Sequence, residues 1–579
     1  MRPTVNNQSD HSNHLGDRWA LILNKREEQV FLVLTLLIGA LSGLAVVAFI
    51  LVTERMGMRL YPVGSSPWRR VLIPVSGSLA MGYLLYRFFP DARGSGVPQT
   101  KAALYARNGY ISLSTVLGKF ACTAATLASG IPLGREGPSV QVGAGIASVL
   151  ARGLGLRTEK VKALLPVGAA AAIAAAFNTP MAAVVFSLEE VMGDLNAPVL
   201  GSVVLASATS WAMLRLLLGN NPLFHVPQYE LVHPVEFAFY AVLGIAGGFL
   251  SVAFTKLLLG MRERFLLLPR RTRWWHPVVG GVMVGLMGWF APHVLGVGYS
   301  YVGDALNGAM ALKIMALLVF LKLFAVTTSY ASGNAGGIFG PSLFLGAMLG
   351  GSIGSIAHYL LPAHTATPGA YALVGMGALF AGIVRAPMTS VLMIFEMTRD
   401  YSVIVPLMIS NAASLFISSK FQKQPIYEAL AQQDGIHLPN LKGHHQTGER
   451  KVFQIMRSTT EILPAEMTLA EAAERARAST FRAWPLADEG SIVGVLSRRQ
   501  LEESIRNGGT ETKLIELMES LDFPHVHADH AVHLALERMS SAQFDMLPVV
   551  TRDNVHKLEG IVTLKDVLDS YAVDPTGSA

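Results

Sequence analysis

The sequence predicts an all-α polytopic membrane protein built from a duplicated unit, followed by a small α/β region that is duplicated as well. Of the 579 residues, 51 % are hydrophobic and only 15 % are charged, a composition typical of proteins with many membrane spans. Comparison of the chain with itself shows one internal repeat in the apolar part and another in the polar C-terminal part. These observations divide the chain into a membrane domain and a soluble region.

The first membrane segment follows a polar N-terminal tail, residues 1–29. The run from Val30 to Val52 has no charged residue, and at about 1.5 Å per helical residue it can cross a hydrocarbon core of about 30 Å. It is too long, and begins too far into the chain, for a cleaved signal peptide. Further apolar segments lie near residues 70–90, 111–130, 161–188, 199–218, 235–260, 275–295, 309–327, 341–361, 370–395 and 402–419. Because several are short or interrupted by Gly and Pro, we expect broken helices that line a cavity.

The net charge of +6 does not indicate a nucleic-acid partner. The sequence has no Lys/Arg-rich block interleaved with aromatic residues, and an excess of basic residues in cytoplasmic loops explains the charge of a membrane protein. The single cysteine, Cys122, lies inside an apolar segment. An intrachain disulfide is therefore excluded, and we expect a structural role for Cys122.

The motif Gly134-Arg135-Glu136-Gly137-Pro138 lies between two long apolar segments. A charged residue in hydrocarbon costs from about 3 to more than about 10 kcal/mol, so such residues rarely persist there without a use. Pro138 suits the first turn of a helix, and the glycines expose backbone amides. These amides and the helix dipole would form an anion site, in which Glu136 is a tethered anion. A Gly-Pro helix break with an Arg–Glu pair at the membrane surface is the alternative.

A repeat within the membrane part places this motif opposite a second one. A shift of 203 residues superimposes Lys119 on Lys322, Gly134 on Gly337, Gly137 on Gly340, Pro138 on Pro341 and Gly143 on Gly346. A shift of 207 superimposes Gly168 on Gly375, Pro180 on Pro387 and Glu189 on Glu396. Since chance does not explain Lys, Pro and Glu recurring in order, we predict repeats of about 67–218 and 275–420. In transporters, duplicated units of this kind meet around a site near the bilayer midplane.

The second copy of the motif, Gly337-Ile338-Phe339-Gly340-Pro341, has Ile and Phe in place of the Arg-Glu pair. Amides at a helix start remain there, without a tethered carboxylate. Two helix N-termini that face one another across the repeat interface could coordinate an anion with backbone N–H groups and little full positive charge. Such a site favours release of the anion as well as binding.

A further loop, Gly94-Ser95-Gly96-Val97-Pro98, could present the Ser95 hydroxyl and bare amides at another helix N-terminus. Gly-Ser-Gly is also common in flexible loops, so this motif alone does not define a site. Tyr427 comes directly after the last apolar segment. A tyrosine in that position is usually an anchor at the membrane interface.

Two adjacent carboxylates, Glu189 and Glu190, end the apolar segment that begins near residue 161. Neighbouring helical residues point about 100° apart, so at most one of the two should face the protein interior squarely. Glu189 has the repeat mate Glu396, which suggests an architectural role such as a hydrogen bond at a helix end. Glu190 is opposite Met397. It would suit a proton path if buried, whereas a solvated Glu190 at the membrane surface would need no function.

Together these motifs resemble those of the CLC family of chloride channels and chloride/proton exchangers. The Gly94, Gly134 and Gly337 motifs and the late Tyr427 have the family's order and spacing over roughly residues 30–433. The resemblance implies an all-helical homodimer with the inverted-repeat CLC fold, each subunit having its own anion pathway. The departures, Val97 where Ile is common and Gly340 in the third motif, remove no proposed ligand.

The resemblance also implies roles by motif position. Ser95 and Tyr427 would offer hydroxyls to a central chloride, Ile338 and Phe339 would offer backbone amides, and Glu136 would be the external gating glutamate. Glu190 aligns with the internal proton glutamate of exchangers, which channels of the family commonly replace with an apolar residue. Ser95 matches the chloride-preferring form, since nitrate-preferring relatives carry proline there. The remaining motif residues are Gly94, Gly96, Pro98, Gly134, Arg135, Gly137, Pro138, Gly337, Gly340 and Pro341.

The composition changes after about residue 432. Residues 434–452 are predicted to be a linker and residues 453–579 a soluble region, in which a shift of 63 places Leu469 opposite Val532 and Pro485 opposite Pro548. Each copy, about 453–508 and 513–573, has the pattern of a helix, an apolar strand, a hairpin and a second helix. The region resembles a pair of CBS motifs, a βαββα module common at the C-terminus of CLC proteins.

In nucleotide-binding CBS pairs, residues at the positions of Thr563 and Asp566 contact phosphate and ribose. A hydroxyl near a helix start and an acceptor carboxylate suit these groups. The first copy has Gln500 in the place of Asp566, so at most one site is well formed. An adenine-nucleotide site and a purely structural module that braces a dimer are both open at this point.

Four histidines of the soluble region, His525, His527, His530 and His533, do not indicate a metal site. His525 and His527 would share one face of a strand, and two imidazoles are too few ligands without others. We therefore expect these histidines in a solvated loop, and neither a metal nor another required cofactor.

From the resemblance we expect transmembrane chloride transport, in the form of chloride/proton exchange gated by a protonatable glutamate. A passive, voltage-gated chloride channel of the same fold is the chief alternative, and a non-transporting membrane sensor is a remote one. No nucleophile–base pair or phosphate-cradling loop suggests an enzyme. The resemblance further implies a multi-pass protein of the plasma or inner membrane with a cytoplasmic C-terminal region. Its partners would be chloride, protons, the lipid bilayer and a second copy of the chain.

Overall fold

The computed structural model describes residues 27–571, apart from gaps at 63, 65, 196–197, 220–223, 225, 227–228, 230, 437, 439–449, 459–460, 480, 489, 507–510 and 519–522. Nearly all of the predicted N-terminal tail and most of the predicted linker therefore lie outside the described residues. The chain divides into two compact units. One is a helical unit that ends at Ala429, and the other is a C-terminal unit that begins at Leu430 and includes Tyr105–Arg107.

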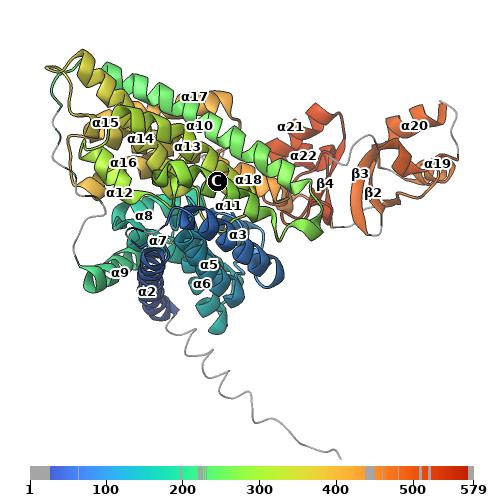
Figure 1. The fold of residues 1–579 in the computed structure, drawn as a ribbon. Coiled ribbons are helices and arrows are strands. Elements are labelled where there is room, and N and C mark those ends of the chain that lie inside the picture. The colour runs from blue at the N-terminus through green and yellow to red at the C-terminus, as the bar shows by residue number, and fades with distance from the viewer. Residues whose placement is uncertain are drawn as a thin grey trace, which may run out of the picture. The chain divides into compact units, whose positions relative to one another are not determined.

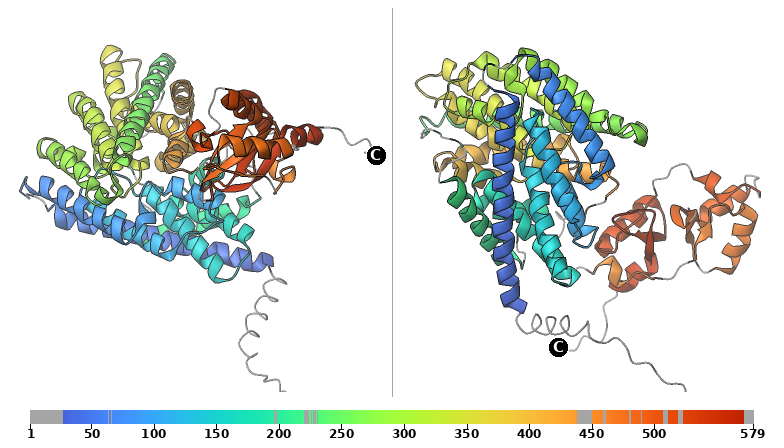
Figure 2. Two further views of the ribbon diagram at one scale, coloured as in Figure 1. Left: turned by 90° about the vertical axis from the view of Figure 1, so that its right-hand side faces the viewer. Right: turned by 60° about the horizontal axis from the view of Figure 1, so that its bottom comes forward.

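The helical unit is all-α, as predicted, and has two halves with the same order of elements (Figures 1 and 2). The first half consists of α2 (Glu27–Leu60), α3 (Arg69–Arg87), α4 (Val97–Tyr105), α5 (Leu113–Ala128), α6 (Glu136–Gly153), α7 (Thr158–Phe177), α8 (Pro180–Phe186) with a π-helical turn (Ser187–Met192), and α9 (Leu200–Leu218). The second half consists of α10 (Glu236–Leu266), α11 (His276–Phe290), α12 (Tyr299–Leu306), α13 (Leu312–Ala331), α14 (Phe339–Leu360), α15 (Pro368–Val384), α16 (Pro387–Thr398) and α17 (Ile404–Phe421), followed by α18 (Ile426–Gln433).

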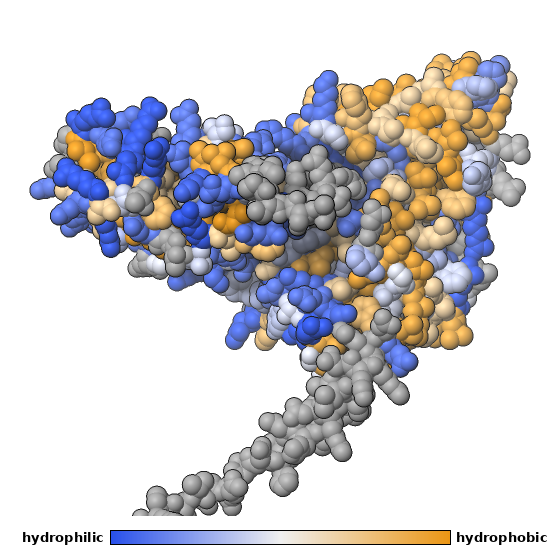
Figure 3. Space-filling model, turned by 180° about the vertical axis from the view of Figure 1, so that it is seen from behind, coloured by the Kyte–Doolittle hydropathy of each residue, from blue (hydrophilic) through white to orange (hydrophobic). Residues whose placement is uncertain are grey.

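Among the described residues, seven helical segments are long and apolar enough to cross a membrane. They are α2, α7, α9, α10, α13, α14, and α17 together with α18. Large apolar side chains such as Leu36, Phe320 and Phe416 remain exposed on these helices, and Figure 3 shows hydrophobic residues over much of this unit. Because water does not tolerate so much exposed apolar surface, the helical unit is embedded in a membrane.

Several helices of this unit are too short to span a bilayer. Helices α4, α8 and α12 have 9, 7 and 8 residues, whereas about 20 residues are needed to cross the hydrocarbon core. The predicted broken helices are therefore confirmed. The ends of these short helices carry backbone N–H and C=O groups without a partner inside the helix. These ends must lie within the protein, because lipid offers no hydrogen-bond partner.

Matched glycines bring the same helices together in each half. A Cβ on Gly143 of α6 would lie 2.2 Å from the carbonyl oxygen of Gly168 on α7. A Cβ on Gly346 of α14 would lie 2.3 Å from the carbonyl oxygen of Gly375 on α15. Contact this close is possible only between glycines. Helix α2 packs on α7 and α9 as α10 packs on α15 and α17, so the equivalence extends to the first helix of each half.

The C-terminal unit contains two copies of one α/β pattern, as predicted. The first copy consists of β1 (Leu463–Pro464), α19 (Leu469–Ala478), β2 (Ala483–Asp488), β3 (Ser491–Ser497) and α20 (Arg498–Arg506), and the second of α21 (Val532–Ala542), β4 (Met546–Val550), β5 (Leu558–Thr563) and α22 (Leu564–Tyr571). β2 pairs with β3, and β4 with β5, in antiparallel hairpins, while β1 is parallel to β2. A shared apolar cluster that includes Val495, Phe523 and Ile561 joins the two copies.

Candidate anion and proton site

The two Gly-rich motifs of the repeat are hydrogen-bonded to one another. The N–H of Gly134 donates to the carbonyl of Gly337 at 2.7 Å, and the N–H of Gly337 donates to the carbonyl of Gly134, also at 2.7 Å. This reciprocal pair is an isolated antiparallel bridge between residues that the 203-residue shift relates. The bridge brings the N-termini of α6 and α14 together in the protein interior.

Glu136 is fully buried, and its carboxylate lies at the N-terminus of the opposite repeat's helix. Oε2 accepts a hydrogen bond of 3.2 Å from the N–H of Gly340, in the first turn of α14. Oε1 accepts a hydrogen bond from the hydroxyl of Tyr299, the first residue of α12. A Cβ on Gly134 would lie 2.2 Å from Oε2, so only glycine leaves room for the carboxylate there. The positive end of the α14 dipole stabilises the negative charge.

Ser95 lies in a loop that requires a glycine on either side of it. Gly94 and Gly96 on either side of it have φ angles of +84° and +105°, which L side chains rarely adopt. A Cβ on Gly96 would lie 2.1 Å from the carbonyl oxygen of Gly137, so this loop packs directly against the Glu136 motif. The backbone N–H of Ser95 donates to the Tyr330 hydroxyl at 3.1 Å, which ties the loop to α13 of the other half.

The hydroxyls of Ser95 and Tyr427 are both buried, and neither has a hydrogen-bond partner of normal geometry among the described residues. The side chains of Tyr427 and Ser95 lie close to one another, and the surroundings of Tyr427 also include Glu190 and Glu136. Buried hydroxyls are usually hydrogen-bonded in folded proteins, so two of them close together suit a ligand that accepts hydrogen bonds. A bound anion would accept a hydrogen bond from both groups.

Ile338 is the N-cap of α14 and Phe339 its first residue, and both are buried, so their amides lie next in sequence to the Gly340 amide that binds Glu136. The Phe339 ring packs against the rings of Phe177, Phe186 and Phe380, at centroid distances of 4.8, 5.7 and 4.4 Å. The side chains of Ile338 and Phe339 are apolar, so any hydrogen bond from these residues to an anion must come from the backbone N–H groups. Their predicted role as amide donors to chloride stays a prediction.

Glu190 lies in the π-helical turn after α8, and its side chain is buried. Its Oε1 accepts a hydrogen bond of 2.8 Å from Nζ of Lys101, a buried residue of α4. The alternative of a solvated Glu190 at the membrane surface is therefore wrong, because an ammonium partner and the surrounding helices enclose it. Lys101 lies three residues after Pro98, in the short helix that follows Ser95. A lysine so close to the Ser95 motif could have marked this position as part of the site.

The neighbouring Glu189 has the architectural role that its repeat mate suggested. Glu189 Oε2 accepts hydrogen bonds from the N–H and the hydroxyl of Thr389 in α16, at 2.8 and 2.7 Å. Glu396 of α16 in turn accepts from the N–H groups of Met181 and Ala182 in α8, at 3.0 and 2.7 Å. Each carboxylate thus caps the helix that carries the other, which confirms the expected hydrogen bond at a helix end.

Tyr299, like Lys101, is a residue of this site that sequence reasoning missed. A shift of 202, one residue less than that of the main repeat, superimposes Gly94-Ser95-Gly96-Val97 on Gly296-Val297-Gly298-Tyr299. The two glycines with the same spacing in each loop could have revealed this match. At the fixed shift of 203 the glycines of the two loops do not superimpose, so the match is not seen.

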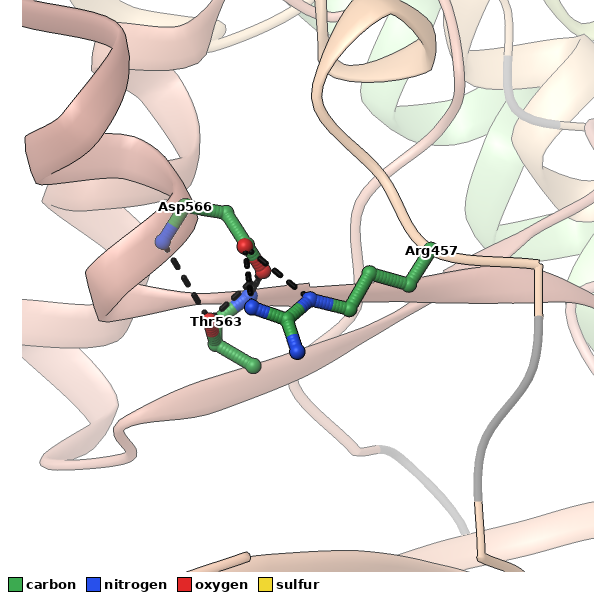
Figure 4. Close-up of polar contacts among 3 residues, drawn as sticks. All are labelled: Arg457, Thr563 and Asp566. Atoms are coloured by element: carbon green, nitrogen blue, oxygen red, sulfur yellow. Dashed lines mark hydrogen bonds and ion pairs between the residues drawn. The ribbon is translucent and has the colours of Figure 1, made fainter.

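In the C-terminal unit, Thr563 and Asp566 bond to each other at the start of α22 (Figure 4). Asp566 Oδ2 accepts from the N–H and hydroxyl of Thr563, at 3.0 and 2.6 Å. Its Oδ1 accepts from Nε and Nη2 of Arg457, at 3.0 and 2.7 Å. Burial raises the pKa of Asp566, but the bonds from Arg457 and Thr563 outweigh it, and the net shift is downward. Ser497 and Gln500 make the same helix cap in the first copy.

The predicted solvated loop of histidines is wrong for two of its members. His527 and His530 are only 2 % and 7 % exposed. The backbone beside His527 pairs with β4 through a bridge between Val526 and Val549, which brings this segment against the strand. The imidazole Nδ1 of His527 lies 2.9 Å from the carbonyl oxygen of Val550. Among the described residues no group of three or more His, Cys, Asp or Glu is arranged to hold a metal ion.

The family model described as voltage gated chloride channel matches residues 77–419, more than half of the chain. The chain belongs to the CLC family. A second family model, that of the CBS domain, matches residues 452–507 and 515–573. The resemblances to CLC proteins and to a CBS pair, inferred from the motifs, are both confirmed.

Two bacterial relatives are similar to more than half of the chain. The chain is 32 % identical to the H(+)/Cl(-) exchange transporter ClcA of Vibrio campbellii over 366 residues, which cover 62 % of this chain and 78 % of the relative. It is 34 % identical to a putative chloride channel protein, ClcB-like, of Ralstonia nicotianae over 382 residues, 64 % of this chain and 88 % of that protein.

Solved CLC structures share the fold. A slow cyanobacterial Cl−/H+ antiporter is 26 % identical, with a TM-score of 0.63 over 72 % of this chain and 99 % of that chain. A eukaryotic CLC transporter has the same TM-score, 0.63, over 93 % of this chain and 97 % of that chain, at 20 % identity. The second match extends over the CBS pair as well, and at this identity it bears on the fold alone.

Proposed function

We propose that this CLC protein exchanges chloride for protons across the membrane. The observation that carries the proposal is the buried carboxylate of Glu136, bonded to the Gly340 amide of the opposite repeat, in the same motif cluster as two hydroxyls without partners. A carboxylate so placed occupies a site that suits a free anion. Relatives named H(+)/Cl(-) exchange transporters support this function.

Chloride would bind between the hydroxyls of Ser95 and Tyr427 and the amides of Ile338 and Phe339. Glu136 competes with chloride for the α14 amides while it is ionised. Protonation removes its charge, so the side chain leaves the anion path and chloride can pass. Exchange requires that neither ion crosses without this change of state in Glu136.

Glu190 would pass the proton between Glu136 and the cytoplasmic side. Its burial beside Lys101 supports an internal titratable group, which a passive channel does not need. One relative carries the name of a putative chloride channel, so a passive channel is the second candidate function.

The proposal is tested by reconstituting the protein in liposomes and imposing a chloride gradient. We expect protons to move uphill against the chloride flux, and Glu190→Gln to abolish proton movement while chloride flux continues. The control is Glu159→Gln, which alters an exposed glutamate in the first turn of α7. Chloride flux without proton movement in the native protein would identify a passive channel. The absence of any chloride flux would favour the non-transporting membrane sensor.

For the assembly, we propose a homodimer in the plasma or inner membrane with the CBS pair on the cytoplasmic side, as the family resemblance implies. Light scattering of the purified protein measures the mass of the assembly. Protease added to sealed inside-out vesicles should cut the CBS pair, and protease added to right-side-out cells should not. The opposite pattern would reverse the orientation.

For the CBS pair, we propose that an adenine nucleotide at Thr563 and Asp566 would have to displace Arg457. Both carboxylate oxygens of Asp566 already accept hydrogen bonds within the chain (Figure 4). Arg457→Gln should then tighten ATP binding by about fivefold, since a competing hydrogen bond is worth about 1 kcal/mol. Titration calorimetry with ATP measures this, and no binding to either protein would mean a structural module.

A further inference from the structure

The two repeats contain matching loops that the main repeat shift does not superimpose. In the first, Gly94 and Gly96 have φ angles of +84° and +105°, and α4 begins at the next residue. In the second, Gly296 and Gly298 have φ angles of +62° and +86°, and α12 begins at Tyr299. The two loops therefore have glycines of positive φ at matching positions before equivalent helices.

A buried lysine holds each loop in the same way. Nζ of Lys119 donates to the carbonyls of Ala92 and Gly94, at 3.0 and 2.6 Å. Nζ of Lys322 donates to the equivalent carbonyls, Val294 and Gly296, at 3.0 and 2.6 Å. Both lysines are fully buried, so the two loops are fixed to the interior by equivalent contacts.

The loops differ in the group that each delivers to the site. The first presents the unpartnered hydroxyl of Ser95, whereas the second presents the hydroxyl of Tyr299, which donates to Oε1 of Glu136. The Tyr299 ring is held on two sides, by the Phe224 ring at a centroid distance of 5.8 Å and by the Arg135 guanidinium 5.7 Å from its centroid. A ring so confined keeps its hydroxyl aimed at the carboxylate.

We propose that Tyr299 is a positioning residue for the gate, whose hydroxyl holds the ionised Glu136 carboxylate in the anion path and so sets the pH at which chloride transport begins. This inference rests on the proposed role of Glu136 as the gate. A hydrogen-bond donor favours the charged form of a carboxylate, so it delays protonation to lower pH. Among the described residues, other titratable or charged side chains lie around Glu136 and the Tyr299 loop: Tyr427 near Glu136, Arg135 over the Tyr299 ring and Lys322 beside Gly298. Arg135 itself pairs with Glu54 at 3.9 Å.

The test is the pH dependence of chloride efflux from liposomes that contain the native protein, Tyr299→Phe or Tyr301→Phe. Phenylalanine keeps the ring and its contacts and removes only the hydroxyl. We expect Tyr299→Phe to raise the pH of half-maximal efflux by about one unit, the size of one hydrogen bond to a charged group. Tyr301 lies on the same helix and packs against His293, 4.7 Å between ring centroids, so Tyr301→Phe should not shift the profile. Equal profiles for both variants would overturn the proposal.

A second comparison separates this proposal from that for Glu136. In a Glu136→Gln background the gate no longer titrates, so adding Tyr299→Phe should leave the pH profile as it was. If Tyr299→Phe shifts the profile equally with and without Glu136, its hydroxyl acts elsewhere and the proposal is wrong. If the native protein transports chloride with no pH dependence, the proposed gate itself fails, whatever Tyr299 does.

Discussion

At the scale of single residues, the hydroxyls of Ser95 and Tyr427 carry the most direct prediction about the ligand. A buried hydroxyl without a partner costs about 1–3 kcal/mol, and the protein leaves two of them at one place. If chloride accepts from both, removing either should weaken its binding. We expect Ser95→Ala and Tyr427→Phe each to raise the Kd for chloride by about tenfold, as measured by titration calorimetry.

The control for this prediction is Tyr371→Phe. The Tyr371 hydroxyl is also buried without a hydrogen-bond partner, but it belongs to α15, where its ring stacks on Tyr240 at a centroid distance of 4.6 Å. Its removal should leave chloride affinity unchanged. An equal loss in all three variants would mean that the effect reports general loosening of the fold and not contact with the anion.

The ion pair between Lys101 and Glu190 carries a second prediction. Both side chains are buried, 4 % and 7 % exposed, so the removal of one partner leaves the other charge poorly solvated. Lys101→Met should lower the free energy of unfolding by about 3–5 kcal/mol, which thermal denaturation in detergent would detect. The double variant Lys101→Met/Glu190→Gln should recover much of that loss. If the single variant is as stable as the native protein, the pair is not enclosed as the structure has it.

At the scale of elements, the contact between α6 and α7 should respond to mutation as its counterpart between α14 and α15 does. Gly143→Ala and Gly346→Ala each place a methyl group less than 2.5 Å from a carbonyl oxygen of the facing helix. Overpacking of this kind costs about 1–3 kcal/mol. We expect similar losses of thermal stability for both variants, since the repeat gives them equivalent surroundings.

Gly260→Ala is the matched control for these glycine variants. Gly260 lies within α10, and a Cβ there would meet nothing within 4 Å. Alanine favours a helix over glycine by about 1 kcal/mol, so this variant should be as stable as the native protein or slightly more so. Destabilisation of all three proteins to the same degree would mean that helix packing is not the cause.

The same elements explain how far the sequence could predict the fold and the site. The repeat placed Gly134 opposite Gly337 and Glu189 opposite Glu396. The two glycines are hydrogen-bonded to each other, and each glutamate caps the helix that carries the other, because duplicated halves meet across their symmetry axis. The matched glycines at a shift of 202 could have shown the loop that carries Tyr299. The bond between Tyr299 and Glu136 has no mate in the other repeat, so the repeat could not show that contact.

At the scale of the whole molecule, the two units obtain their stability in different solvents. The helical unit exposes apolar side chains to lipid, whereas the C-terminal unit buries its apolar residues in small cores of its own. His527 follows Val526, a residue of one of these cores, although the sequence predicted it in a solvated loop. Its burial makes the stability of the CBS pair depend on pH.

Acidification should destabilise the CBS pair through His527. Burial, and then the charge of Arg552, lower the pKa of His527 from 6.5 to about 2. Below pH 6.5 the unfolded chain therefore binds a proton here that the folded protein does not, and the free energy of unfolding falls by about 1.4 kcal/mol per pH unit. Hydrogen exchange of the β4 amides in the full-length protein, corrected for intrinsic rates, should lose about 2 kcal/mol of protection between pH 6.5 and pH 5. His527→Gln cannot take up the proton, so its protection should vary less with pH. The same slope in both proteins would place the acid sensitivity at another group.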